Sequence, residues 1–211
     1  MRSAPPDEPQ RRVPPEISGD HGGRPAGRRR GLTRAVFGAV ILSLAIRRIR
    51  PDEGLQLRAL RLRALADAPM AFGSTLVQEE AFPERVWHER AAHEASGGER
   101  VTFIAERDNQ WIGLATGIPH EADDPERSGP VLVGMFVDPA ERGHGLGVTL
   151  VEAIAAWARA RGAACLYLWV TSTNTPAIAL YSRCGFRPTG ETRPVAHTPS
   201  VTELRMGLDL Q

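Results

Sequence analysis

The segment from residue 131 to residue 170 constrains the fold most. Two apolar runs, the nearly unbroken Val131–Val137 and the continuous Ala164–Val170, are typical of strands covered on both faces of a sheet. Between them, apolar residues at helical spacing predict an amphipathic helix from Leu146 to about Arg161, ended by Gly162. Strand, helix and strand within about forty residues predict a right-handed parallel βαβ unit.

The remaining pattern predicts further strands and helices on either side of this unit. Asp52 is a candidate N-cap for a helix that reaches Pro69, and Pro83 can open a helix that Gly97 closes. Strands are expected at 46–50, 101–106, 111–118, 186–189 and 201–208, and a short helix at 175–184. The fold class is therefore α+β, with a mixed, mostly antiparallel central sheet, one parallel βαβ crossover and flanking helices.

The N-terminal part differs from the rest, which gives two expected regions: an extension at 1–45 and a domain at 46–211. Residues 1–30 are rich in proline, glycine and arginine and are expected to be disordered. The run Ala35–Ile46 is too short to span a membrane. Its basic flank and length allow a signal peptide, whereas its continuity with the domain allows it to lead into the first strand. We expect a cytoplasmic protein without membrane attachment.

The charge distribution and the positions of the cysteines and histidines argue against a nucleic-acid partner and a metal site. Residues 1–50 carry 11 arginines and 4 acids, and residues 51–211 carry 15 arginines and 21 acids. An acidic body argues against a nucleic-acid partner, because binding phosphates needs clustered positive charge. Cys165 and Cys184 match no zinc spacing, and His88 and His93 lie five residues apart, so no metal site is expected.

A glycine-rich stretch, Arg142-Gly143-His144-Gly145-Leu146-Gly147, precedes the helix of the βαβ unit. Glycines let several backbone N–H groups converge on an anion, and the helix N-terminus adds partial positive charge. A turn without a ligand is the alternative. The third glycine comes one residue too early for a dinucleotide fingerprint, and the absence of lysine excludes a P-loop.

These residues resemble the acetyl-CoA motif of the GNAT superfamily of N-acetyltransferases, which reads Arg/Gln-x-x-Gly-x-Gly/Ala. Downstream residues agree with the same family: Asn174, Ala177, Leu180-Tyr181 and Gly185-Phe186. The resemblance covers about residues 46–211 and implies the GNAT-like acyl-CoA N-acyltransferase fold. It also implies an acetyltransferase that uses acetyl-CoA as co-substrate. The acceptor would be a primary amine of a small molecule or a protein, and a homodimer is left open.

The resemblance also implies roles for single residues. Pantetheine would lie between two parted parallel strands beside the main chain of Phe136 and Val137, and the pyrophosphate would rest on the amides of residues 142–147. Tyr181 would protonate the departing thiolate as general acid, with simple packing as the alternative. Asn174 would orient the cofactor, cap the following helix, or do both.

The general base is where the sequence departs from many relatives, because the strand 131–137 offers no glutamate. Candidates elsewhere are Glu79, Glu80, His120, Glu121, Asp123 and Asp124, and a water chain is the alternative. The missing acid also keeps open a non-catalytic acyl-CoA-binding sensor module with the same fold.

Overall fold

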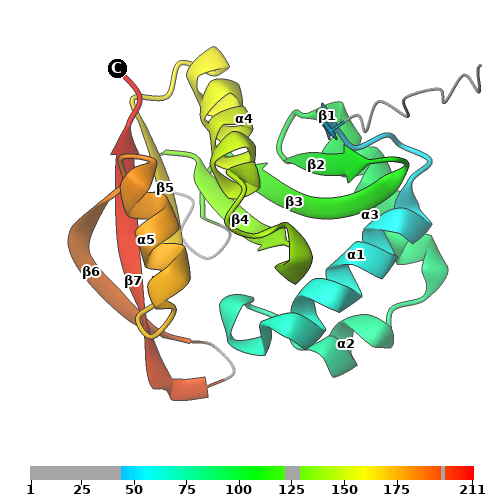
Figure 1. The fold of residues 1–211 in the computed structure, drawn as a ribbon, viewed down its shortest axis with the longest axis horizontal. Helices are drawn as coiled ribbons and strands as arrows, with labels where there is room; N and C mark the ends of the chain where they lie inside the picture. Colours follow the sequence, from blue (N-terminus) through cyan, green and yellow to red (C-terminus); the bar gives the residue numbers. More distant parts are fainter. Residues whose placement is uncertain (1–43, 122–128, 196–197) are drawn as a thin grey trace, which may run out of the picture. The chain divides into compact units, whose positions relative to one another are not determined.

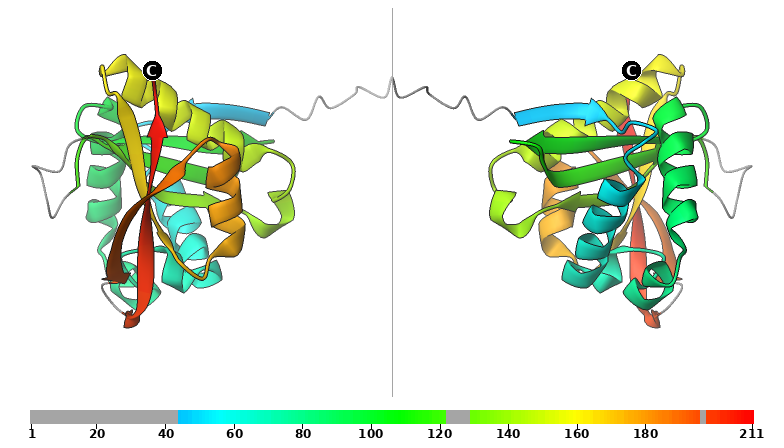
Figure 2. Two further views of the ribbon diagram at one scale, coloured as in Figure 1. Left: turned by 90° about the vertical axis from the view of Figure 1, so that its left-hand side faces the viewer. Right: turned by 90° about the vertical axis from the view of Figure 1, so that its right-hand side faces the viewer.

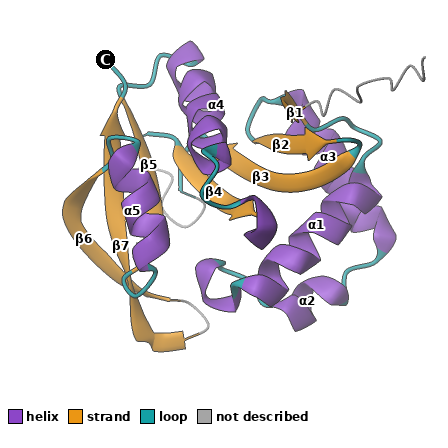
Figure 3. Ribbon diagram, in the orientation of Figure 1, coloured by secondary structure: helices purple, strands orange, loops and turns teal. Residues whose placement is uncertain are grey.

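A computed structural model describes residues 44–121, 129–195 and 198–211. All of them lie in one compact unit within residues 40–211. Its centre is a seven-stranded sheet in the order β1-β2-β3-β4-β5-β7-β6 (Figure 1). The strands are β1 Leu44–Arg48, β2 Val101–Arg107, β3 Gln110–Ile118, β4 Val131–Val137, β5 Cys165–Thr171, β6 Arg187–Val195 and β7 Thr198–Asp209. The helices are α1 Gly54–Asp67, η1 Pro69–Ala71, α2 Leu76–Glu80, α3 Glu84–Ser96, η2 Pro139–Glu141, α4 Leu146–Ala160 and α5 Thr175–Arg183 (Figure 3).

The strand directions confirm the predicted mixed sheet. The pair β4 and β5 is parallel, and every other neighbouring pair is antiparallel. Helix α4 makes the crossover between the two parallel strands. Strands β2 and β3 form a hairpin, whose turn residues Asp108 and Asn109 both have positive φ. This is the backbone that a tight two-residue hairpin needs, and asparagine and aspartate tolerate it best.

Helices cover both faces of the sheet (Figure 2), and a hydrophobic cluster lies on each face. On one face, α1 and α3 bury Leu60, Leu65 and Trp87 against Ile104 of β2. On the other face, α4 and α5 pack over the strands, and Leu150 and Ile154 of α4 are fully buried there. Each helix thus covers one side of the sheet with its apolar stripe.

Helix α1 begins differently from the prediction. The N-cap position belongs to Glu53, not to Asp52, and no side chain caps the helix. The Glu53 carboxylate instead accepts hydrogen bonds from the Arg47 guanidinium at 2.6 and 2.8 Å and from the Arg50 amide at 2.8 Å. The ion pair between Arg47 of β1 and Glu53 therefore holds the start of α1 in place of a side-chain cap.

Several element bounds also differ from the expectation. Strand β1 begins at Leu44, so the end of the apolar run forms part of the sheet, while residues 1–43 lie outside the described part. Helix α2 is a single short element that the sequence pattern did not reveal, although Thr75 and Gln78 form a capping box at its start. Within the described residues, no helix is long and apolar enough to cross a membrane.

Gly113 of β3 supports the end of β4 by close contact, which makes a stability test. A Cβ at Gly113 would lie 2.9 Å from the Phe136 carbonyl oxygen and 3.2 Å from Leu150 Cδ1. Gly113→Ala should therefore lower the free energy of unfolding by about 1–3 kcal/mol, because the neighbouring backbone must move. Gly73→Ala is the control, since a Cβ there meets nothing within 4 Å. Equal urea midpoints for both variants would contradict the packing.

Candidate active site

Strands β4 and β5 part shortly after they start to pair. Their parallel ladder consists of two residue pairs, Val131 with Tyr167 and Leu132 with Leu168. Beyond these pairs β4 continues to Val137, and β5 continues to Thr171 while pairing with β7 on its other side (Figure 3). The facing edges of the two strands therefore carry main-chain groups with no partner strand within the described residues. Such groups are ready to hydrogen-bond an extended ligand.

A bulge in β4 lies at the point of parting. The register with β3 shifts between Leu114 and Thr116, and Gly134 of β4 has φ of +62°. The Asp138 amide donates to the Ile112 carbonyl at 2.8 Å, so Asp138 faces β3. Because antiparallel residues alternate, the main chain of Val137 faces the open edge instead. The Phe136 main chain faces β3, and its ring is buried in the core below α1.

Two glycines give the loop between β4 and α4 an open, exposed backbone. Gly143 and Gly145 have φ of +83° and +85°, and a Cβ at either would meet nothing within 4 Å. These two glycines are thus required by the backbone conformation and leave the loop surface open. No side chain caps the α4 N-terminus, so the amides of its first turn, starting at Leu146, are available to an anion.

Gly147 has a different role from the other two glycines. A Cβ there would lie 2.9 Å from Leu180 Cδ2, so this glycine lets α4 and α5 approach each other. Of the remaining loop residues, Leu146 is buried in the core, whereas His144 is exposed.

Arg142 holds the base of the loop rather than projecting from it. Its Nε donates to the Val137 carbonyl at 3.0 Å, and its guanidinium forms an ion pair with Asp67 at the end of α1. The guanidinium of Arg142 is therefore engaged with the protein. Arg142 thereby links the loop to the end of β4 and to the end of α1.

Asn174 and Tyr181 mark the two ends of α5. The Asn174 side chain caps the helix by accepting a hydrogen bond from the Ala177 amide at 3.2 Å. Tyr181 is 6% exposed and packs edge-on against Phe186, with ring centroids 5.8 Å apart. Burial raises the pKa of the Tyr181 phenol well above its ordinary value, and the nearby Cys184 adds to the effect. The phenol is therefore protonated at neutral pH, as a proton donor must be.

Two of the candidate bases are held by arginines. Glu79 is 2% exposed and accepts hydrogen bonds from Arg61 at 2.9 Å and from Arg90 at 3.3 Å. Burial by itself raises the pKa of Glu79, but the hydrogen bond and charge of Arg61 outweigh it, and the net pKa is lowered. Glu121 is 4% exposed and lies 3.3 Å from the Arg205 guanidinium. Arginines therefore hold both side chains, and the lowered pKa keeps Glu79 an anion.

Of the other candidate bases, only Glu80 and His120 lie in the described residues. Glu80 is exposed on α2, and the His120 ring lies 3.1 Å from the carbonyl oxygen of its neighbour Glu121. Asp123 and Asp124 lie outside the described residues. His88 and His93 are exposed, and the described ranges contain no group of side chains arranged to hold a metal ion.

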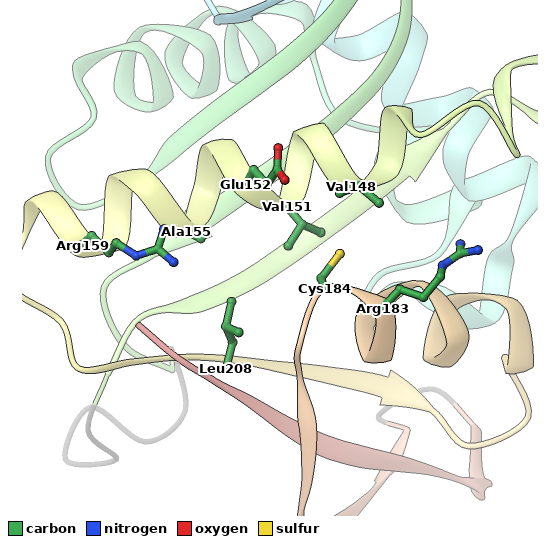
Figure 4. Close-up of a pocket in the computed structure, with 8 residues that line it drawn as sticks. All are labelled: Val148, Val151, Glu152, Ala155, Arg159, Arg183, Cys184 and Leu208. Atoms are coloured by element: carbon green, nitrogen blue, oxygen red, sulfur yellow. The ribbon is translucent and has the colours of Figure 1, made fainter. Parts of the chain in front are cut away.

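A separate hollow of about 260 Å³ lies between α4 and the end of α5 (Figure 4). None of the predicted site residues lines this hollow. The residues that line it are Val148, Val151, Glu152, Ala155, Arg159, Arg183, Cys184 and Leu208. Burial raises the pKa of the Cys184 thiol, and the charge of Glu152 adds to this. A protonated thiol is a poor nucleophile, which agrees with a reaction that does not use Cys184.

The sequence profile described as the acetyltransferase (GNAT) family matches residues 62–186. A mycothiol acetyltransferase from Thermobispora bispora is 35% identical over 133 residues, which are 61% of this chain and 41% of that protein. A streptothricin acetyltransferase from Streptomyces lavendulae is 50% identical over 50 residues, 24% of this chain and 26% of that protein. The chain thus matches less than half of the length of these relatives.

Solved structures show the same fold at low identity. A GNAT-family acetyltransferase from Streptococcus pneumoniae has a TM-score of 0.66 at 22% identity, over 80% of this chain and all of that chain. The YncA protein of Salmonella typhimurium, solved with its cofactor acetyl-CoA, has a TM-score of 0.66 at 19% identity, over 80% of this chain and 95% of that chain.

Titration of the tyrosines tests the environment of Tyr181. The chain has two tyrosines, and burial is the main reason why the pKa of each is raised. When the folded protein is titrated, tyrosinate absorbance should not appear with a midpoint near pH 10. The ordinary tyrosine pKa of about 10 should return only when the protein is unfolded. Stability should fall as pH rises above about 10, because the unfolded chain then loses these protons more readily. Two tyrosines titrating near 10 in a protein with native circular dichroism would contradict this environment.

Proposed function

Because the chain belongs to the GNAT family of acetyltransferases, we propose that it transfers an acetyl group from acetyl-CoA to a primary amine by direct attack. The observation that carries this proposal is the open glycine loop at the α4 N-terminus, beside two parallel strands that part after two residue pairs. A pyrophosphate fits the amides of the loop, and an extended pantetheine arm fits the free edge of β4.

The chain's own groups account for the steps of such a transfer. The amides at the start of α4 hold the anion, and the Val137 amide is offered to the developing oxyanion, while the Val137 carbonyl accepts the hydrogen bond from Arg142. Tyr181 holds the proton that the leaving sulfur needs, since burial keeps its phenol neutral. Asn174 fixes the start of α5, and therefore places Tyr181, through its cap on Ala177. Acetyl-CoA supplies the activated carbonyl, so no covalent enzyme intermediate is required.

The names of similar proteins guide the choice of acceptor class. The curated relatives are named for mycothiol and streptothricin. Another structural neighbour is a ribosomal-protein-alanine N-acetyltransferase, with a TM-score of 0.65 at 23% identity. The closer sequence agreement lies with the first group, so we favour a small-molecule amine over a protein amine.

One observation favours a second function, a non-catalytic acyl-CoA-binding module. The bulge of β4 carries Gly134, and strand β4 contains no carboxylate that could accept the amine's proton. Such a module would keep the loop and the parted strands and would bind acetyl-CoA without turnover.

An assay of the purified full chain with acetyl-CoA and a panel of primary amines separates the two functions. We expect release of the CoA thiol together with an acetylated amine. Tyr181→Phe should lower kcat by about 10²-fold or more, because the general acid is lost, and should leave acetyl-CoA affinity nearly unchanged. Tyr167→Phe is the matched control, because Tyr167 lies on β5 against Arg205 and should retain full activity.

The alternatives have separate signatures in this assay. Binding of acetyl-CoA without acetylation of any amine would favour the non-catalytic module. Turnover by Tyr181→Phe at the wild-type kcat, with chemistry rate-limiting, would reduce Tyr181 to a packing residue.

A further inference from the structure

Three buried polar side chains form a continuous hydrogen-bonded chain beneath the bulge of β4. Thr116 of β3 and Thr102 of β2 have their hydroxyl oxygens 2.7 Å apart. Thr102 Oγ1 donates to Glu94 Oε2 of α3 at 2.6 Å. Thr116, Thr102 and Glu94 are 5%, 0% and 6% exposed, so solvent hardly reaches the chain along its length.

The carboxylate at one end fixes the direction of the protons. Thr102 has a single hydroxyl proton, which Glu94 accepts. The bond between the two hydroxyls must therefore be donated by Thr116, whose only proton is then engaged as well. Thr116 Oγ1 is left with acceptor lone pairs alone. At the other end, Arg100 Nε lies 3.1 Å from Glu94 Oε1 and balances the charge of the carboxylate.

The acceptor end of this chain faces Gly134. A Cβ at Gly134 would lie 3.7 Å from Thr116 Oγ1 and 3.7 Å from Arg61 Nη1. Arg61 is paired with Glu79 and cannot accept a proton, and its charge disfavours an ammonium group beside it. A neutral amine beside the bulge would thus have Thr116 as its nearby hydrogen-bond acceptor.

We propose that Thr116, Thr102 and Glu94 form a proton relay that serves as the general base of the acetyl transfer. The proposal rests on the proposed function and replaces the carboxylate that strand β4 lacks. Thr116 is the residue that touches the amine, whereas Thr102 and Glu94 act through it. The hydrogen bonds already run in the direction in which the proton has to move.

The step balances as follows. The amine nitrogen bonds to the thioester carbonyl carbon and gives one proton to Thr116 Oγ1. Thr116 passes its own proton to Thr102, and Thr102 passes its proton to Glu94. The C–S bond breaks with its electron pair on sulfur, which takes a proton from Tyr181. Glu94, which is 6% exposed, then loses one proton to solvent, the hydroxyls of Thr102 and Thr116 rotate back to their starting directions, and Tyr181 regains one proton, so the protein returns to its starting state.

Steady-state kinetics of full-length variants test the relay, with the amine that the wild type acetylates fastest. Thr102→Val breaks the chain in the middle, and Glu94→Gln keeps an acceptor oxygen but cannot take up the proton. Both should lower kcat by about 10²-fold, with an unchanged dissociation constant for acetyl-CoA. Thr102→Ser restores the hydroxyl and should retain most of the activity, which a purely structural role of the β-branched side chain would not allow. Thermal melting of each variant checks that it is folded.

The outcomes separate the relay from the function on which it rests. Wild-type kcat in both Thr102→Val and Glu94→Gln would overturn the relay and leave acetyl transfer intact. Thr102→Ser as slow as Thr102→Val would also overturn it. If Thr102→Val does not fold, Glu94→Gln decides the question. A wild-type protein that acetylates no amine would overturn the proposed function, and the relay with it.

Discussion

The site depends on two neighbouring parallel strands, β4 and β5, whose hydrogen-bonded pairing stops before the strands end. A buried or half-buried main-chain group without a partner is costly, so a strand edge left open inside a fold needs a compensating contact. In β4 the open edge follows the bulge at Gly134, where the register against β3 shifts. The bulge turns the main chain of Val137 toward this edge, and Arg142 secures its carbonyl from the loop side. An extended acyl-CoA arm is the kind of ligand that satisfies such an edge.

The glycines around this edge are required for different physical reasons, namely backbone conformation at some positions and close packing at others. Gly143 and Gly145 adopt a left-handed backbone with open space beside them, which suits contact with a ligand. Gly147 has no such backbone but lies against Leu180, which sets the distance between α4 and α5. Gly134 removes a side chain where it would face Thr116 and Arg61. A motif that reads as one glycine-rich loop therefore serves binding and packing at once.

Much of the fold could be predicted from the sequence, because its signals are local. The bounds predicted for β4 agree with the structure, and α4 begins at the predicted Leu146, since apolar runs and helical periodicity are properties of neighbouring residues. The family predicted from the glycine loop and the α5 residues is confirmed by the family match, and the fold class is confirmed by the structure and its solved neighbours, whereas the acetyl transfer itself stays a proposal. The roles of single residues at the site stay predictions.

What the sequence did not reveal depends on contacts between distant residues. The ion pair between Arg142 of the loop and Asp67, 75 residues earlier, has no signal in the sequence around either residue. Asp52 was expected to cap α1, but the ion pair between Glu53 and Arg47 of β1 decides where the helix begins. The hydrogen bonds between Thr102, Thr116 and Glu94 join two strands and a helix through buried side chains. No spacing of these residues along the sequence predicts such contacts.

The binding of acetyl-CoA at the loop is the central claim, and calorimetry of two alanine variants tests it most directly. Gly145 and Gly162 lie at the two ends of α4 with φ of +85° and +76°, and a Cβ at either meets nothing within 4 Å. Alanine should therefore impose a similar backbone strain of about 1–3 kcal/mol at both positions. Gly145→Ala should weaken acetyl-CoA binding by about tenfold or more, because relief of the strain turns the loop amides away, whereas Gly162→Ala should bind like the wild type. Equal affinity in the two folded variants would contradict the assignment of this loop as the cofactor site.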